Sequence, residues 1–320
     1  MNSLVLASLS LPNLVSRLPG GVAQGIIWGI MALGVYITFR LLDVADLTVD
    51  GSFTTGGAVT VMLIIAGWPA WAALLAAVVA GLLAGLVTGL LHTKLGIPAI
   101  LAGILTQFAL YSINLRIMSM KANTPVNPDK YSLFLTLRSV PGAIWKGLLL
   151  AAVLIALLYW YFGTEQGSAI RATGANPAMS RAQGININAM KVLGLSLSNG
   201  MVALSGGLMA QYQGFADINM GRGAIVIGLA AVIIGDVIFS RIFRNFGLKL
   251  LAVVLGSIIY YIVMQVVLWL KLDSDMFKLL SAAIVAVFLA IPYWKGKYFR
   301  APVKVAAGEN TVKTGGEHHA

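Results

Sequence analysis

The chain has 320 residues, of which 59% are hydrophobic and only 10% charged, and its formal net charge is +11. Because soluble domains carry about 25% charged residues, this composition predicts an all-α polytopic membrane protein whose basic loops face anionic lipid. It has no basic, aromatic-interleaved surface segment, so no nucleic-acid partner is expected. The absence of cysteine excludes disulfides, thiolate metal sites and cysteine nucleophiles.

The first 20 residues have no Lys or Arg before Arg17 and therefore lack the basic region of a cleavable signal peptide. Their apolar stretch is short and interrupted by Pro12, which predicts an interfacial or partly inserted segment. An inserted helix here would change the side on which the N-terminus lies.

A helix needs about 20 apolar residues to cross a bilayer core. By this measure we expect about nine spans, within a range of eight to ten, of which the second is short and polar at its start. They cover residues 21–41, 52–67, 69–91, 98–118, 143–163, 191–212, 223–239, 248–270 and 276–293. No linker divides them, so residues 1–294 are expected to form one transmembrane domain, followed by a disordered cytoplasmic tail at 295–320.

The Lys and Arg residues favour one orientation. The loop 164–190 is expected in the cytoplasm, together with the short basic segments 92–94, 240–249 and 295–300. The opposite side then receives 119–142, 213–222 and 271–275, which contain Asp129, Asp217, Asp273 and Asp275.

Glycines recur at helical spacing in two spans. Gly81, Gly85 and Gly89 share one helix face, and Gly25 and Gly29 repeat the device in the first span. Small residues at this spacing predict close helix packing.

The segment DVADLTVDGSFTTGGAVTV (residues 43–61) places acids, Thr and Gly directly before an apolar run. One interpretation is a broken helix at membrane depth, as in many transporter sites. The other is a cytoplasmic turn in which Asp50 or Ser52 caps the next helix. Asp46, Thr48, Asp50 and Ser52 are therefore candidate residues of a translocation path.

Other polar residues lie inside expected spans, where they either line such a path or form interhelical hydrogen bonds. They are Gln107, Ser112 and Asn114 in the fourth span, and Ser196, Ser198, Asn199 and Ser205 in the sixth. Asp236 lies near a span end, and an ion pair with Arg241 or Arg244 is favoured over a proton-coupling role.

Enzymatic signatures are lacking. The chain has neither a GxxxxGK[ST] loop nor an HExxH motif, and its adjacent histidines, His318 and His319, lie in the tail. We therefore expect no catalytic residues, no metal and no cofactor bound by this chain. Energy for active transport has to come from an ion gradient or a separate ATPase.

Residues 171–186 read RATGANPAMSRAQGIN. Asn176 is a natural N-cap for Pro177 at the first helical position, and Gly184 ends the helix. This pattern predicts an isolated helix of about two turns whose small face, formed by Ala178, Met179, Ala182 and Ile185, is either a docking surface or simply solvated.

These residues resemble the cytoplasmic coupling segment of ABC-importer permeases for branched-chain amino acids, ribose-type sugars and nucleosides. The family pattern is approximately R-A-x-G-x-N-x-x-A-A-x-x-x-G-I, and Met179 and Ser180 depart from its Ala pair. ADLTVDGSFTTGGA (45–58) and GLAAVIIGD (228–236) resemble two further family elements, with Asp236 in place of a Gly.

The resemblance implies a permease subunit in the bacterial inner membrane, acting as a homodimer. The implied partners are an ATPase that binds ATP and Mg, an extracytoplasmic binding protein, and a small polar solute, for which an amino acid is the best candidate. A less-studied branch of the family is linked to aromatic amino acids. The alternatives are a self-sufficient ion-coupled secondary transporter or channel, and an intramembrane enzyme.

The resemblance also implies roles for particular residues. The residues expected to contact the ATPase are Arg171, Ala172, Gly174, Asn176, Pro177, Arg181, Gly184 and Ile185. Four outer basic residues either meet the binding protein or are ordinary solvated charges, namely Lys121, Lys130, Arg138 and Arg222.

Overall fold

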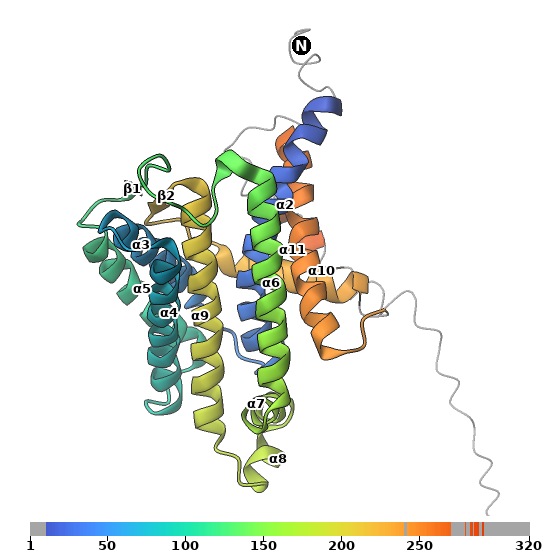
Figure 1. Ribbon diagram of the computed structural model, residues 1–320. Helices are drawn as coiled ribbons and strands as arrows, with labels where there is room; N and C mark the ends of the chain where they lie inside the picture. Colours follow the sequence, from blue (N-terminus) through green and yellow to red (C-terminus); the bar gives the residue numbers. More distant parts are fainter. Residues whose placement is uncertain are drawn as a thin grey trace, which may run out of the picture.

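The computed structural model describes residues 11–239 and 242–269 and, beyond them, residues 279, 282, 283, 285–287 and 290. Its helices are α2 (Leu11–Tyr36) with the π-helical turn η1 (Ile37–Leu41), α3 (Val49–Ile65), α4 (Ala70–Thr93), α5 (Ala99–Ile117), the 3-10 turn η2 (Leu137–Ser139), α6 (Val140–Gly163), α7 (Glu165–Ala175), α8 (Pro177–Ala182), α9 (Ile187–Gln213), α10 (Ala224–Phe239) and α11 (Phe246–Trp269). Two short strands, β1 (Asn123–Pro125) and β2 (Phe215–Asp217), complete the elements (Figure 1).

The all-α polytopic fold is confirmed. Within the described residues, six helices are long and apolar enough to cross a membrane, namely α2 with η1, α4, α5, α6, α9 and α11, while α3 and α10 are shorter apolar helices. These eight correspond to the first eight predicted spans. The predicted ninth span, at 276–293, and the tail at 295–320 lie largely or wholly outside the described residues.

The first span starts earlier than predicted. Helix α2 begins at Leu11, and residues 11–20 continue directly into the span instead of forming a separate interfacial segment. Pro12 lies in the first turn, where its missing N–H has no helical acceptor, so it does not interrupt the helix.

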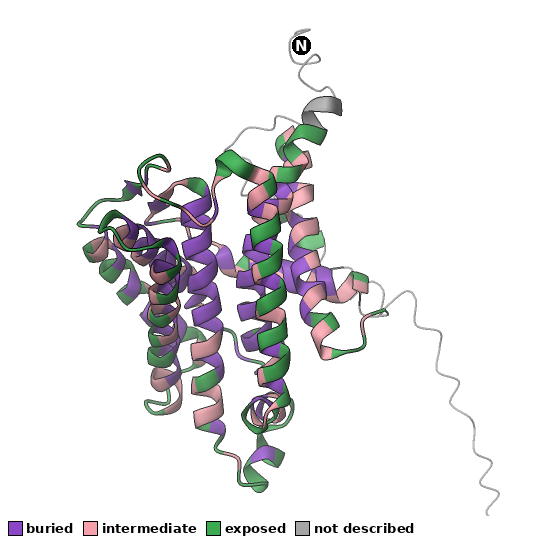
Figure 2. Cartoon of the chain, in the orientation of Figure 1, coloured by how far each residue is buried: buried purple, intermediate pink, exposed green. Residues whose placement is uncertain are grey.

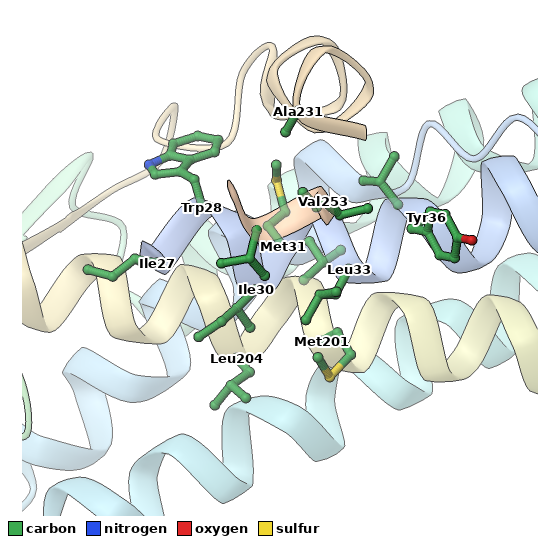
Figure 3. Packing of buried hydrophobic residues seen from close by; sticks show 14 of the residues in the cluster. Ile27, Trp28, Ile30, Met31, Leu33, Tyr36, Met201, Leu204, Ala231 and Val253 are labelled. Carbon is green, nitrogen blue, oxygen red and sulfur yellow. The ribbon is translucent and has the colours of Figure 1, made fainter. Parts of the chain in front are cut away.

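Helices α9 and α2 form the centre of the molecule. Helix α9 packs against α4 and α3 on one side and against α2, which in turn packs on α11 and α10. In Figure 2 the middle of α9 is buried while much of α6 is exposed. Figure 3 shows the apolar side chains at this centre, including Ile30 and Leu33 of α2 with Met201 and Leu204 of α9.

The predicted glycine packing is confirmed. A Cβ on Gly81 or Gly85 would overlap backbone carbonyl oxygens of α9, and one on Gly89 would lie 2.8 Å from the Cα of Val192. A Cβ on Gly25 would lie 2.6 Å from the Cα of Ile258 in α11. These contacts bring helix backbones close together, as small residues allow.

Two loops meet at one end of the molecule, shown at the top of Figure 1. Strands β1 and β2 pair antiparallel with Asn123 opposite Asp217, and the Val126 N–H donates to the Gly214 carbonyl. This ribbon is a small departure from the all-helical expectation, and it joins two predicted outer loops.

Asp236 forms an ion pair, but with a partner other than those predicted. Its carboxylate lies 3.3 Å from Nε of Arg40 at the end of the first span. Arg241 lies outside the described residues. Because α10 packs directly against α2, the span packed beside Asp236 supplies the cation, and sequence proximity to Arg244 was misleading.

We predict that Gly85→Ala lowers the free energy of unfolding by about 1–3 kcal/mol, because the added methyl group meets the fixed backbone of Leu195 and Ser196. The measurement is a denaturant titration in mixed micelles. The matched control is Gly20→Ala, since nothing lies within 4 Å of a Cβ at that position. Equal stability of the two variants would contradict the close packing of α4 on α9.

Candidate functional site

The second apolar segment is one short helix, α3, and irregular backbone precedes it. Residues 42–48 are irregular between η1 and α3, and they lie beside Asn199, midway along α9. The buried Asp46 carboxylate accepts hydrogen bonds from the Thr48 N–H, at 2.9 Å, and from the Asn199 amide, at 2.7 Å. The structure therefore has the irregular backbone of the broken-helix interpretation. Thr48 precedes the helix, without a side-chain cap bond.

A chain of hydroxyl and amide groups extends from this break. Ser52 Oγ donates to Asn199 Oδ1 at 2.6 Å, and the Thr48 and Thr88 hydroxyls lie 2.8 Å apart. Thr88 in turn donates to Thr106 at 2.9 Å. The network joins α3, α4, α5 and α9, and every bond lies in the interior, so each polar group is satisfied without water.

Several predicted path residues belong to this network or to similar contacts. Asp46, Thr48, Ser52 and Asn199 are each at most 2% exposed. Ser196, Ser198 and Ser205 donate to the carbonyls of Leu82, Gly34 and Ile27. These seven residues therefore form hydrogen bonds between segments of the protein, as the second interpretation of the polar residues in spans predicts.

Helix α10 begins where α3 begins. The Asp50 carboxylate accepts hydrogen bonds from the backbone N–H groups of Gly223, at 2.9 Å, and Ile225, at 3.0 Å. Thr54, one turn later in α3, accepts from the Gly221 N–H at 3.2 Å. A carboxylate at a helix N-terminus pairs with orphan donors and with the helix dipole. Asp50 thus caps a different helix from the one predicted.

A cavity of about 270 Å³ lies beside this junction. It is lined by Asp50, Gly51, Thr54, Gln107, Phe108, Tyr111, Asn114, Ile218 and Arg222. Three predicted path residues, Asp50, Gln107 and Asn114, therefore share one cavity. Thr54 and Tyr111 were missed, although each lies four residues after a predicted one and hence on the same helix face.

The cavity wall offers unused polar groups. Asn114 is 1% exposed, and neither its amide nitrogen nor its amide oxygen has a hydrogen-bond partner among the described residues. Arg222 and Tyr111 add a cation and a phenol, and Phe108 adds an aromatic surface. Buried amides are normally paired, so the geometry fits a small polar solute. Within the described residues, no group of three or more His, Cys, Asp or Glu side chains could hold a metal ion.

The coupling segment lies at the opposite end from the ribbon, at the bottom of Figure 1. The Asn176 side chain caps α8 by accepting from the Met179 N–H at 3.0 Å, Pro177 is its first residue, and Gly184 follows with φ +80°. Ala178, Met179, Arg181 and Ala182 are exposed. Ser180 is buried and bonds to the Asn176 carbonyl.

The predicted isolated helix is in fact the second of two. Helix α7 precedes it and is capped by Thr164, whose side chain accepts from the Gly167 N–H. Its Gly174 packs against the backbone of Leu41 and Leu42. The sequence prediction missed α7 because the helix is too polar to show an apolar stripe. The structure also separates Arg171, over the Phe246 ring at 5.5 Å, from the exposed residues of α8.

The four outer basic residues have different surroundings. Arg138 pairs with Asp129, and this hydrogen bonding lowers the pKa of the exposed Asp129 carboxyl. Lys130 lies over the Tyr131 ring, Lys121 is exposed, and Arg222 lines the cavity.

The family described as "Branched-chain amino acid transport system / permease component" matches residues 18–289. The chain belongs to this family. The permease is 41% identical over 269 residues to the tyrosine transport system permease protein of Clostridioides difficile, covering 84% of this chain and 89% of that protein. It is 34% identical over 271 residues to an uncharacterized protein of Rickettsia prowazekii, covering 83% and 94%. No solved structure matches it significantly.

Membership of this family confirms the resemblance to ABC-importer permeases that the sequence motifs indicated. The protein is a multi-pass ABC-type permease for an amino acid-like solute, in bacteria a protein of the inner membrane. As a permease component, it is a transport subunit of the membrane.

We predict that Asp50→Ala speeds amide hydrogen exchange in the first turn of α10, because two N–H groups lose a charged acceptor worth about 1.5–3 kcal/mol each. Asp50→Asn, which keeps one acceptor oxygen, is expected to show a smaller effect. Exchange in α11 serves as the internal reference. Unchanged exchange at residues 223–226 in Asp50→Ala would contradict the capping role.

Proposed function

We propose that two copies of this permease form the path of an ATP-driven importer for an amino acid, and that the cavity between α3, α5 and residues 218–222 is part of that path. The observation that carries the proposal is the buried Asn114 amide, which has no hydrogen-bond partner among the described residues and lies in a cavity beside the N-termini of the short helices α3 and α10. Unusually short hydrophobic helices with N-termini inside the protein form solute sites in many transporters.

The cavity chemistry supports an amino acid as the solute. Arg222 and Asn114 provide donors for a carboxylate, and Asp50 provides a negative charge for an ammonium group. Phe108 and Tyr111 provide aromatic contact. A volume of about 270 Å³ is just below the ~300 Å³ at which drug-sized pockets begin, which suits one amino acid. The relative from Clostridioides difficile transports tyrosine by its name, and an aromatic amino acid is our first candidate.

The position of the cavity supports a second copy of the chain. Phe108 and Tyr111 are 71% and 42% exposed on α5, so the cavity opens on a side face of the single chain. Polar groups facing lipid would be costly. A second copy against this face would close the path laterally, and an extracytoplasmic binding protein would deliver the solute near the β1–β2 ribbon.

The coupling segment provides a mechanical connection. We place α8 against a separate ATPase that binds ATP and Mg, with Met179, Arg181 and Ala182 at the contact. Gly174 in α7 packs on Leu41 and Leu42, the residues at the edge of the irregular segment 42–48. A displacement of α8 would therefore be transmitted through α7 to the segment before α3 and from there to the α3–α10 junction. ATP-driven closure of the ATPase could in this way shift the permease between two conformations.

The test is uptake of labelled tyrosine into proteoliposomes that contain the permease, its ATPase and its binding protein. We expect uptake that requires ATP and all three proteins. Uptake by the permease alone, driven by an ion gradient, would favour the secondary-transporter alternative and contradict the proposal.

A second prediction concerns α8. Arg181→Glu combined with Ala182→Trp reverses a charge and adds bulk on its exposed surface, so the variant is expected to insert and fold but to lose association with the ATPase. Co-purification and thermal stability are the measurements. The matched control makes the same two kinds of change at Lys191 and Leu193 near the start of α9. Intact ATPase binding and transport in the α8 variant would exclude the docking role.

A further inference from the structure

A larger cavity, of about 550 Å³, lies at the end of the molecule that carries α7. It is lined by Tyr159, Trp160, Phe162, Gly163, Thr164, Arg171, Asn245 and Phe246. These residues come from the end of α6, from α7 and from the start of α11. The cavity is separate from the one between α3 and α5, with which it shares no lining residue.

The cation in this cavity has unused hydrogen-bonding capacity. The Arg171 guanidinium lies over the Phe246 ring, with Cζ 5.5 Å from the ring centroid, and Nη2 makes one long contact, 3.4 Å, to Ser168 Oγ. Its Nε is buried without a hydrogen-bond partner among the described residues. The two ion pairs in the described part of the chain involve Arg40 and Arg138, so neither neutralises Arg171. A guanidinium fork is well matched to a phosphate oxygen pair.

The surroundings indicate which phosphate would reach it. Tyr159 and Trp160 are exposed at the end of α6, and such aromatic residues gather where a membrane meets water. Leu149, Val153 and Leu157 are also exposed and lie on one face of α6, further toward its middle. This apolar stripe leads from the cavity toward the middle of the span and has the length and character to accommodate an acyl chain.

We propose that this cavity binds the headgroup of an anionic phospholipid. Arg171 would hold the phosphodiester, the Thr164 and Asn245 side chains would complete its hydrogen bonds, and an acyl chain would lie along α6. An anionic phospholipid keeps the net negative charge of its phosphodiester, which matches the one guanidinium among the lining residues, whereas the choline of a zwitterionic headgroup cancels that charge. Because the cavity is bounded by α6, α7 and α11, the bound lipid would fix α7, the helix whose Gly174 packs on Leu41 and Leu42. The proposal rests on the aromatic end and the apolar stripe of α6, which place the cavity at the membrane surface, and it does not depend on the transport function.

The experiment is native mass spectrometry of the delipidated full-length permease, titrated with phosphatidylglycerol or with phosphatidylcholine of the same acyl chains. We expect one tightly bound phosphatidylglycerol per chain and at least about tenfold weaker binding of phosphatidylcholine. Arg171→Gln is expected to abolish this preference, because a charge-assisted hydrogen bond contributes about tenfold or more in affinity. Arg181→Gln, an equal charge change on the exposed surface of α8, is expected to preserve it.

A second variant keeps the test decisive if Arg171→Gln does not fold. Asn245→Asp keeps the guanidinium and adds a negative charge to the opposite wall, and it is expected to weaken phosphatidylglycerol binding about tenfold. Its control is Asn188→Asp, at an exposed position of α9. Equal binding of the two lipids by the unmodified chain, or full retention of phosphatidylglycerol by both cavity variants, would overturn the proposal. Binding is measured without ATPase or transport, so failure of the proposed import function would leave this result unaffected.

Discussion

The Asp50 carboxylate accepts hydrogen bonds from the first backbone N–H groups of α10, and this contact joins the N-termini of two short apolar helices, α3 and α10. A bilayer core offers no water to an unpaired N–H, so irregular backbone is stable there only where the protein supplies the partners. Asp46 does the same for the segment before α3 by accepting from Thr48 and from Asn199. Two acids that would be costly in isolation thus satisfy the backbone N–H groups before α3 and at the start of α10 inside the protein.

The rest of the molecule is arranged around this junction. Helices α2, α9 and α11 meet through glycines and apolar side chains and form a close-packed scaffold. The junction is joined to that scaffold by the close packing of α3 on α9 and by directional hydrogen bonds to Asn199. Gly174 packs on Leu41 and Leu42 and so connects the coupling end to the edge of the irregular segment, while α7 also packs against α6 and α9. A permease driven from outside its own chain requires a fixed scaffold, a polar junction and such packed connections to the coupling end.

Sequence patterns predicted most of this scaffold because its signals are local. Apolar length identified eight apolar helices, six of them long enough to cross a membrane. Glycine spacing identified the faces of α4 and α2 that pack closely, but not the helices that they pack against. The prediction of Asn176 as a cap for α8 needed only neighbouring residues.

The predictions that were wrong concerned contacts between residues far apart in the sequence. Asp50 caps α10, 173 residues away from its partner Gly223, and Asp236 pairs with Arg40. No periodicity in either segment encodes such a partner. Among the predicted path residues, Gln107 and Asn114 line the cavity, whereas the Asn199 amide donates its hydrogen bond to Asp46. The packing of α5 and α9 decides which of these side chains reaches the cavity.

The central claim is that the Asp50 junction borders a solute path that opens to water. The absence of cysteine from the chain permits a direct measurement, in which single cysteines at Gln107, Tyr111, Leu149 and Ser198 are reacted with a membrane-impermeant maleimide in the assembled transporter. The account predicts labelling of Gln107→Cys and Tyr111→Cys that changes when ATP is bound and falls when the amino acid is present, with no labelling of the lipid-facing Leu149→Cys or the buried Ser198→Cys. Equal inertness of all four positions in every nucleotide state would contradict it.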